Sequence, residues 1–164
     1  QLLRADGWSG DGGGANTAVH IFEYDRRFDQ AYPGSFVYYD YNEPRGVPDE
    51  LRGSMDFILM DPPYLNAECV GKFLETADAL ARHPRQAVAD GEGQVSSTAT
   101  SASATMMMFI TSPLNEAFMR EEAGMRRIRF RLAFESKFAT PMSLYTNYAS
   151  EALGGWVAAA EEDK

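Results

Sequence analysis

Cysteine and histidine are scarce in this sequence of 164 residues, and their scarcity excludes several kinds of site. Cys69 is the only cysteine, so the chain can form no intramolecular disulfide and no zinc site built from several cysteines. His20 and His83 are the only histidines, and they supply too few ligands for a typical transition-metal centre. We therefore expect no metal cofactor.

The sequence also lacks long apolar runs and an excess of positive charge. No apolar stretch approaches the roughly 18 residues that a membrane-spanning helix needs, and no signal peptide opens the chain. We expect a cytoplasmic protein with no membrane partner. The 15 Lys and Arg against 24 Asp and Glu give a formal net charge of −9. Because such a chain repels a phosphate backbone unless its basic residues gather on one face, nucleic acid is the less favoured partner.

The remaining composition is that of an ordinary globular protein. Hydrophobic residues make up 45% of the chain and aromatic residues 12%, which excludes wholesale disorder. Length and composition together predict one domain over residues 1–155, followed by an acidic tail over residues 156–164. The first residue is Gln1 rather than Met, so we expect a fragment or a processed product, and we expect it to be monomeric.

Short apolar runs predict the strands of an α/β fold. The runs 19–23, 36–40 and 56–60 are mostly apolar and are separated by polar or helical stretches. This arrangement is typical of parallel strands joined by crossover connections. Residues 106–111 form a fourth apolar run, which we interpret as another buried strand.

Two helices and one insertion lie between and after these runs. Asn66 is a candidate N-cap for a helix over residues 67–82, whose apolar residues recur at helical spacing. Residues 86–105 are rich in Ala, Ser, Thr and Gly and contain no aromatic residue, which predicts a disordered surface insertion. Ser112 is a candidate N-cap for a second helix over residues 113–124.

The last third of the chain has a different pattern. Residues 128–134 alternate between apolar and mostly basic side chains, which predicts a strand with one face in water. A strand of this kind is usually antiparallel, and residues 142–148 are its expected hairpin partner. The sequence therefore predicts an α/β fold with a mostly parallel sheet and a C-terminal antiparallel hairpin.

The motif Asp61-Pro62-Pro63-Tyr64 directly follows a predicted strand. In a parallel sheet, ligands bind beyond the carboxyl ends of the strands, where this tetrapeptide would lie. Two prolines stiffen the turn and remove two backbone donors, so that the turn presents carbonyl oxygens. An amine held between the Asp61 carboxylate and the Pro62 carbonyl would direct its lone pair outward, as methyl transfer to nitrogen requires. Tyr64 offers an aromatic face to a flat base or a cationic chain.

The motif also has a purely structural interpretation and an open choice of acceptor. A Pro-Pro turn can simply end a strand, with the aspartate capping the next helix. The position of the motif between an apolar strand and an amphipathic helix favours the site instead. A lysine amine and the exocyclic amine of adenine can both be held by this tetrapeptide, so the motif does not decide between them.

Three blocks of sequence resemble one known family. They are EYDRRF at 23–28, YYDYNEP at 38–44 and DPPYLNAEC at 61–69, in that order, and YTNY at 145–148 resembles the closing strand of the same family. The family consists of the N(6)-adenine-type methyltransferases that act as elongation factor 1-alpha lysine methyltransferases. The resemblance implies a Rossmann-like class I fold of seven strands, S-adenosyl-L-methionine as methyl donor, and a lysine of translation elongation factor 1-alpha as acceptor.

The resemblance also implies roles for individual acidic residues. Glu23 would bind the ribose hydroxyls of the cofactor, since a carboxylate accepts two hydrogen bonds, and Asp25 is a weaker candidate for that role. Asp40 would lie near the adenine amino group, and Asp61 would also contact the cofactor. Each of Glu23 and Asp40 can alternatively be a solvated acid at a strand end. The target amine would be held by the four residues of the motif, Asp61, Pro62, Pro63 and Tyr64.

Two departures from the family keep other functions open. The first strand of the family and the cofactor loop after it would precede Gln1, and we interpret the glycines at 10–14 as an inserted surface loop rather than a substitute. One alternative is therefore an inactive, truncated binding module. The other is an adenine N(6)-methyltransferase of DNA or RNA, which would need a flipped base and a basic groove. The arginines within 126–131 are the one basic cluster available for it, and they are otherwise expected to be solvated.

Overall fold

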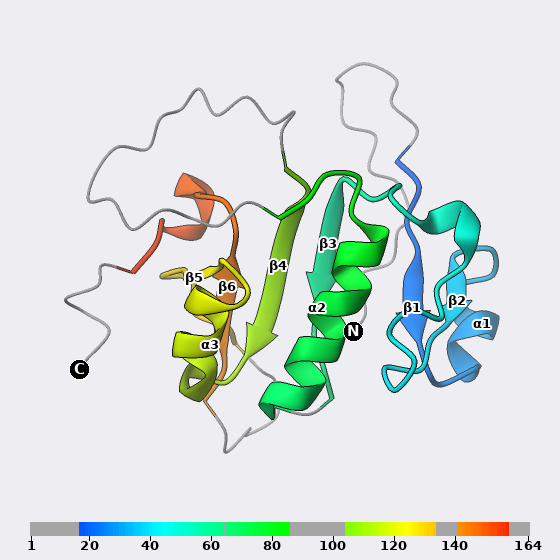
Figure 1. Ribbon diagram of the computed structural model, residues 1–164, viewed down its shortest axis with the longest axis horizontal. Helices are drawn as coiled ribbons and strands as arrows, with labels where there is room; N and C mark the ends of the chain where they lie inside the picture. Colours follow the sequence, from blue (N-terminus) through cyan, green and yellow to red (C-terminus); the bar gives the residue numbers. More distant parts are fainter. Residues whose placement is uncertain (1–16, 64, 86–103, 134–140, 158–164) are drawn as a thin grey trace. The chain divides into compact units, whose positions relative to one another are not determined.

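A computed structural model describes residues 17–63, 65–85, 104–133 and 141–157 (Figure 1). The chain separates into two compact units, Gln1–Tyr38 and Tyr39–Lys164. The prediction of one domain over residues 1–155 stays a prediction.

The first unit is a small β-α-β arrangement. Strand β1 (Ile21–Glu23) is followed by helix α1 (Arg27–Ala31) and strand β2 (Phe36–Tyr38). The two strands are parallel, with Ile21 opposite Phe36 and Glu23 opposite Tyr38. Both occur where the apolar runs predicted strands, but each is only 3 residues long.

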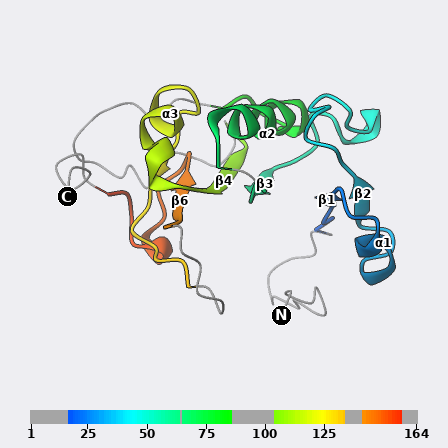
Figure 2. The ribbon, with the colours of Figure 1, turned by 90° about the horizontal axis from the view of Figure 1, so that it is seen from below.

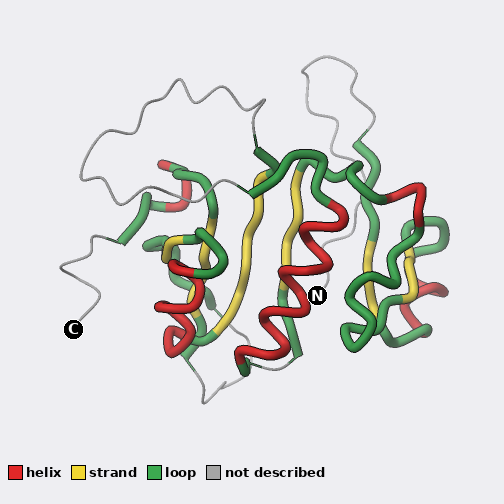
Figure 3. Tube along the Cα trace, viewed as in Figure 1, coloured by secondary structure: helices red, strands yellow, loops and turns green. Residues whose placement is uncertain are grey.

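The second unit is built on a four-stranded sheet with the order β3-β4-β6-β5 (Figure 3). Strands β3 and β4 are parallel, as the sequence predicts for these two runs, whereas β4 with β6 and β5 with β6 are antiparallel pairs. The elements of the unit are η1 (Asp49–Leu51), β3 (Phe57–Met60), α2 (Ala67–Leu80), β4 (Met106–Thr111), η2 (Pro113–Asn115), α3 (Glu116–Glu121), β5 (Arg126–Arg127), β6 (Ser143–Thr146) and η3 (Glu151–Leu153).

Helix α2 forms where the sequence predicts it and for the predicted reason. The Asn66 side chain accepts a hydrogen bond from the backbone N–H of Cys69 at 2.8 Å, which satisfies one of the free donors at the helix start. Val70, Leu74 and Leu80 recur at helical spacing and are buried. Helices α2 and α3 lie on the same face of the four-stranded sheet, as the view along the sheet edge shows (Figure 2).

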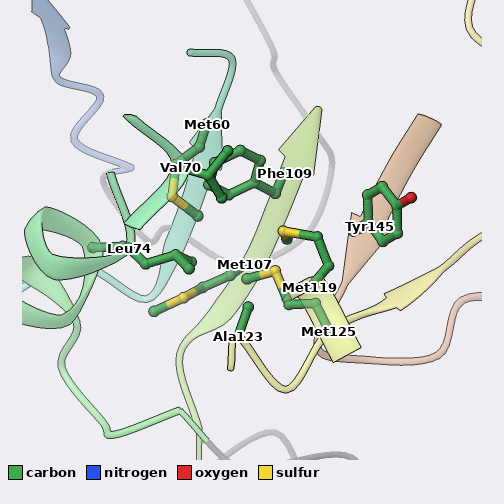
Figure 4. Close-up of a cluster of buried hydrophobic side chains, with 10 residues drawn as sticks. Met60, Val70, Leu74, Met107, Phe109, Met119, Ala123, Met125 and Tyr145 are labelled. Carbon is green, nitrogen blue, oxygen red and sulfur yellow. The ribbon is translucent and has the colours of Figure 1, made fainter. Parts of the chain in front are cut away.

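The hydrophobic core lies between this face of the sheet and the two helices (Figure 4). Phe109 in the middle of β4 is fully buried, and its ring lies 6.5 Å from the ring of Phe73 on α2 in an edge-to-face arrangement. The buried cluster consists of Met60, Val70, Leu74, Ala77, Met107, Phe109, Met119, Ala123, Met125 and Tyr145. Four of its members are methionines, whose flexible side chains fill irregular space.

The other face of β3 and β4 carries exposed apolar side chains. Successive residues of a strand point to opposite faces of a sheet. Met60 and Met107 are therefore buried against the helices, whereas Leu59 and Met106 remain 59% and 37% exposed on the other face. Phe57, which is paired with Met106, is 44% exposed. The apolar runs 56–60 and 106–111, which the sequence predicts as buried strands, are thus buried on one face only.

The prediction of a strand over residues 128–134 is wrong beyond Ile128. Strand β5 comprises Arg126–Arg127, and Ile128 forms a single antiparallel bridge with Trp156. Beyond Ile128 the backbone bonds elsewhere, since the Arg129 N–H donates to the Gly155 carbonyl at 2.9 Å. Strand β6 begins at Ser143, and the last hydrogen bond toward it runs from the Ile128 N–H to the Leu144 carbonyl at 2.9 Å. Residues 129–133 form no strand, and residue 134 lies outside the described residues.

Three further boundaries differ from the predictions. The helix expected over 113–124 consists of the two short helices η2 and α3, and Gly124 follows with a φ of +63°. Thr105, which the sequence places in the insertion, is buried, and its hydroxyl accepts from the His83 N–H at 3.0 Å and donates to the Met55 carbonyl at 3.0 Å. Residues 86–103 lie outside the described residues. Trp156, expected in the tail, packs beside β5.

Candidate active site

The carboxyl ends of β3 and β4 meet at one edge of the sheet (Figure 1). Asp61 follows the last residue of β3, and Thr111 is the last residue of β4. Parallel strands in register, with Met60 opposite Phe109, bring these two ends to the same level. Ligands of open α/β sheets bind at such an edge, and Asp61, Pro62 and Pro63 directly follow β3 there.

The motif residues differ in their exposure. Asp61 and Pro63 are exposed, whereas Pro62 between them is buried and anchors the turn. Tyr64 lies outside the described residues. Although Asp61 is exposed as a residue, protein atoms around its carboxyl partly remove it from water, and this burial raises the pKa of Asp61 above its ordinary value. A carboxylate with a raised pKa holds a proton more readily than a free surface aspartate does.

The loop that carries the motif is fixed on both sides. On one side Asn66 caps α2 through its bond to the Cys69 N–H. On the other side the Asn115 side-chain amide donates to the Leu65 carbonyl at 2.7 Å and to the Thr111 hydroxyl at 2.9 Å. Asn115 therefore ties the end of β4 to Leu65, which follows the motif in sequence.

Asp40 lies in a turn directly after β2 in sequence. This turn is packed onto α2. The Asp40 carboxylate accepts hydrogen bonds from the Asn42 backbone N–H at 2.9 Å and from the Asn42 side chain at 3.0 Å. Tyr39, next to it, is hydrogen-bonded through its hydroxyl to the Thr76 hydroxyl at 2.7 Å. The Thr76 hydroxyl in turn donates to the Pro44 carbonyl at 3.0 Å. These bonds fix the turn that presents Asp40.

Glu23 and Asp25 belong to the first unit and are engaged to different degrees. Glu23 is the last residue of β1, and one of its carboxylate oxygens accepts from the Asp25 N–H at 2.9 Å. Both oxygens of Asp25 accept from Arg27, whose guanidinium lowers the pKa of Asp25. A carboxylate has about four acceptor positions, so Glu23 keeps capacity for further donors while Asp25 has less.

The residues that position the site were partly missed by sequence reasoning. Asn66 was found from its place before a helix, but Asn115 and Thr76 were not singled out. Nothing in the sequence indicates that the Asn115 side chain reaches back to the Leu65 carbonyl, 50 residues away. The structure places Asp40 and Asp61 in the second unit, and Glu23 and Asp25 in the first.

The arginine cluster is partly engaged within the protein. The Arg126 guanidinium lies 4.9 Å from the centre of the Trp156 ring. Arg127 Nε lies 3.4 Å from a carboxylate oxygen of Glu116, and both side chains are largely buried. Within the described part of the chain, no three His, Cys, Asp or Glu side chains are grouped as a metal site. No helix among the residues that the structure describes is long and apolar enough to span a membrane.

Known proteins have sequences similar to that of this chain. The chain is 32% identical over 139 residues to EEF1A lysine methyltransferase 1 of Gallus gallus, covering 84% of this chain and 54% of that protein. It is 31% identical over 136 residues to the protein of that name from Mus musculus, covering 82% and 53%. A protein-lysine N-methyltransferase of Dictyostelium discoideum is 47% identical over 66 residues, 40% of this chain and 30% of the relative.

The chain thus spans about half the length of the first two of these relatives. No solved structure matches it significantly. A family profile described as probable N6-adenine methyltransferase matches residues 8–150. This range includes Glu23, Asp40, the Asp61-Pro62-Pro63 turn and strand β6. The chain therefore belongs to the family of probable N6-adenine methyltransferases.

Proposed function

We propose that this protein is an S-adenosyl-L-methionine-dependent protein-lysine N-methyltransferase that acts on translation elongation factor 1-alpha. The observation that carries the proposal is the Asp61-Pro62-Pro63 turn at the carboxyl end of β3, in a chain whose similar proteins are named EEF1A lysine methyltransferases. The described sheet would be part of a complete seven-stranded class I fold.

The acceptor amine would bind to the turn itself. The Asp61 carboxylate and the Pro62 carbonyl are both hydrogen-bond acceptors, and the prolines contribute no competing N–H donors. Two acceptors that hold the two hydrogens of an amine leave its lone pair directed away from them. Asp61, Pro62, Pro63 and Tyr64 are therefore the proposed acceptor residues.

A lysine acceptor must lose a proton before it can react. With an ordinary pKa of about 10.4, only roughly one lysine in 2,500 is neutral at pH 7. Burial raises the pKa of Asp61, which makes this carboxylate a better temporary acceptor for the ammonium proton than a solvated one would be. The proton then passes to water, and the neutral amine carries out the in-line attack.

The cofactor assignments rest on individual carboxylates. When bound, S-adenosyl-L-methionine supplies an electrophilic methyl group on a sulfonium. Glu23 has acceptor capacity for the ribose hydroxyls, and Asp40, held in its turn by Asn42, can accept from the adenine amino group. Asp25 is the weaker candidate because Arg27 occupies both of its oxygens. Asp61 would contact the cofactor as well as the amine.

We expect the protein to work as a monomer in the cytoplasm, where its translation-factor substrate acts. The net charge of −9 supports a protein substrate over nucleic acid. The adenine N(6)-methyltransferase function remains the second candidate, favoured by the description of the matching family. It would need a basic surface, and Arg126 and Arg127 are already engaged by Trp156 and Glu116.

The test uses the purified protein with tritium-labelled S-adenosyl-L-methionine. Elongation factor 1-alpha and an adenine-rich duplex are offered side by side, with Asp61→Ala as the variant and Asp56→Ala, an exposed aspartate paired with Arg82, as the matched control. We expect label in the protein band, lost in Asp61→Ala and kept in Asp56→Ala. Label in the duplex would establish the nucleic-acid function. A folded protein that labels neither would favour the inactive binding module.

A further inference from the structure

The four residues after β4 form a turn beside the motif loop. Thr111 ends β4, and Ser112 to Asn115 lead into α3 through the 3-10 helix η2. The Asn115 side chain reaches across to the Leu65 carbonyl at 2.7 Å. Because Leu65 follows the motif closely in sequence, this contact places the turn next to the residues that would hold the acceptor.

The turn is rigid. The Leu114 N–H donates to the Ser112 hydroxyl at 3.2 Å, and the Asn115 N–H donates to the Ser112 carbonyl at 3.0 Å. Ser112 itself is buried, and Pro113 fixes the backbone at the start of η2. The bonds from Asn115 to Leu65 and Thr111 complete the network. These bonds fix the backbone of the turn and therefore the point from which its exposed side chain extends.

The exposed side chain of this turn is apolar. Leu114 is 93% exposed, more than any other large hydrophobic residue among those described. Single exposed leucines occur on ordinary surfaces. This leucine differs because its turn is bonded to the proposed acceptor loop, so the rigid network holds an apolar side chain at the edge that a protein substrate must approach.

We propose that the turn Ser112–Asn115 is the second wall of the acceptor site, with Leu114 as a substrate contact and Asn115 as a positioning residue. Leu114 packs against an apolar part of the protein substrate, either the methylene stem of the target lysine or an apolar side chain beside it. Asn115 holds the turn against the motif loop. This inference rests on the proposed protein-lysine methyltransferase function and names how that site recognises its substrate.

Leu114→Ser tests the contact. Since the side chain is exposed, its removal leaves the thermal unfolding temperature unchanged. We expect the dissociation constant and the KM for elongation factor 1-alpha to rise about tenfold, as for the loss of an apolar side chain buried on binding, while kcat and cofactor binding stay the same. Phe130→Ser, which removes another exposed apolar side chain in a different part of the chain, is the control and should bind as the wild type does.

Asn115→Asp tests the positioning. The variant keeps the size of the side chain but loses the amide donor to the Leu65 carbonyl, so we expect kcat to fall about tenfold through misplacement of the motif. The KM for cofactor should not change, and a variant with a longer amide, Asn115→Gln, should recover part of kcat. A general loss of folding would instead lower the unfolding temperature and the fraction of the protein that binds the cofactor in calorimetry.

The outcomes separate this inference from the proposed function. Binding of the factor is measured by calorimetry in parallel with the transfer of label. If the wild-type protein transfers methyl groups to the factor but Leu114→Ser binds the factor equally well, the inference is overturned and the proposed function stands. If the wild-type protein neither binds nor labels the factor, both are overturned. Weaker binding by Leu114→Ser with unchanged cofactor affinity supports the inference.

Discussion

Phe109→Ala should destabilise the second unit strongly, and the same substitution at Phe57 should not. Phe109 is 0% exposed. It lies in the middle of β4, which pairs with β3 on one side and β6 on the other, and its ring packs against Phe73 of α2. Replacing a buried phenylalanine with alanine costs about 3–5 kcal/mol, because the loss of apolar burial adds to the cavity left behind. This is a large part of a typical unfolding free energy of about 5–15 kcal/mol.

Phe57 provides the matched control in the neighbouring strand. It is 44% exposed on the other face of the sheet. Complete burial of such a side chain is worth about 1.5–3 kcal/mol, so a half-buried one contributes about 1 kcal/mol, and its removal leaves no closed cavity. Denaturant unfolding of both variants at a fixed pH, with the slope compared to the wild type, gives the two differences. Equal losses at the two positions would refute the assignment of one buried and one open face.

Three further predictions concern the elements that fix the site. Asn66→Ala should lose about 1 kcal/mol of unfolding free energy with the cap of α2, and Asn66→Asp, which keeps an acceptor, should not. Thr76→Val should lose about 1 kcal/mol because it removes the 2.7 Å hydrogen bond between the Thr76 and Tyr39 hydroxyls, whereas Thr76→Ser, which keeps the hydroxyl, should lose less. Asp61→Asn should raise stability at neutral pH. Burial raises the folded-state pKa of Asp61, so its charged form opposes folding above that pKa, and the gain should vanish as the pH falls below the unfolded value of about 3.9. Urea unfolding at several pH values measures all three, and a gain that persists in acid would contradict the third.

The sequence predicted the elements that depend on local patterns. The apolar runs located β1, β2, β3 and β4, and Asn66 with its helical spacing located α2. These signals are strong because one short stretch determines the element. The antiparallel end of the sheet was predicted less well. The alternation after Ile128 is a genuine period of two, but a strand needs a continuous partner. The ladder with β6 comprises Arg126 and Arg127, and the Arg129 N–H bonds to the Gly155 carbonyl instead.

The site shows the same division between local and distant information. Asp61, Pro62 and Pro63 were predicted to follow a strand, and in the structure they directly follow β3. The bonds from Asn115 to Leu65 and from Thr76 to Tyr39 join residues 50 and 37 positions apart. One sequence contains no signal for such pairs, because any asparagine or threonine satisfies local chemistry equally well. The sequence also did not predict that Leu114 is exposed, since an apolar residue is expected to be buried.

The most direct test of the proposed activity is mass spectrometry of elongation factor 1-alpha after incubation with the purified protein and S-adenosyl-L-methionine. We predict one or more methyl groups on a lysine of the factor with the wild-type protein, and an unmodified factor with Asp61→Ala. Asp56→Ala should modify the same lysine as the wild type. A lysine methylated equally well by Asp61→Ala, or a factor left unmodified by a folded wild-type protein that binds the cofactor, would contradict the proposal.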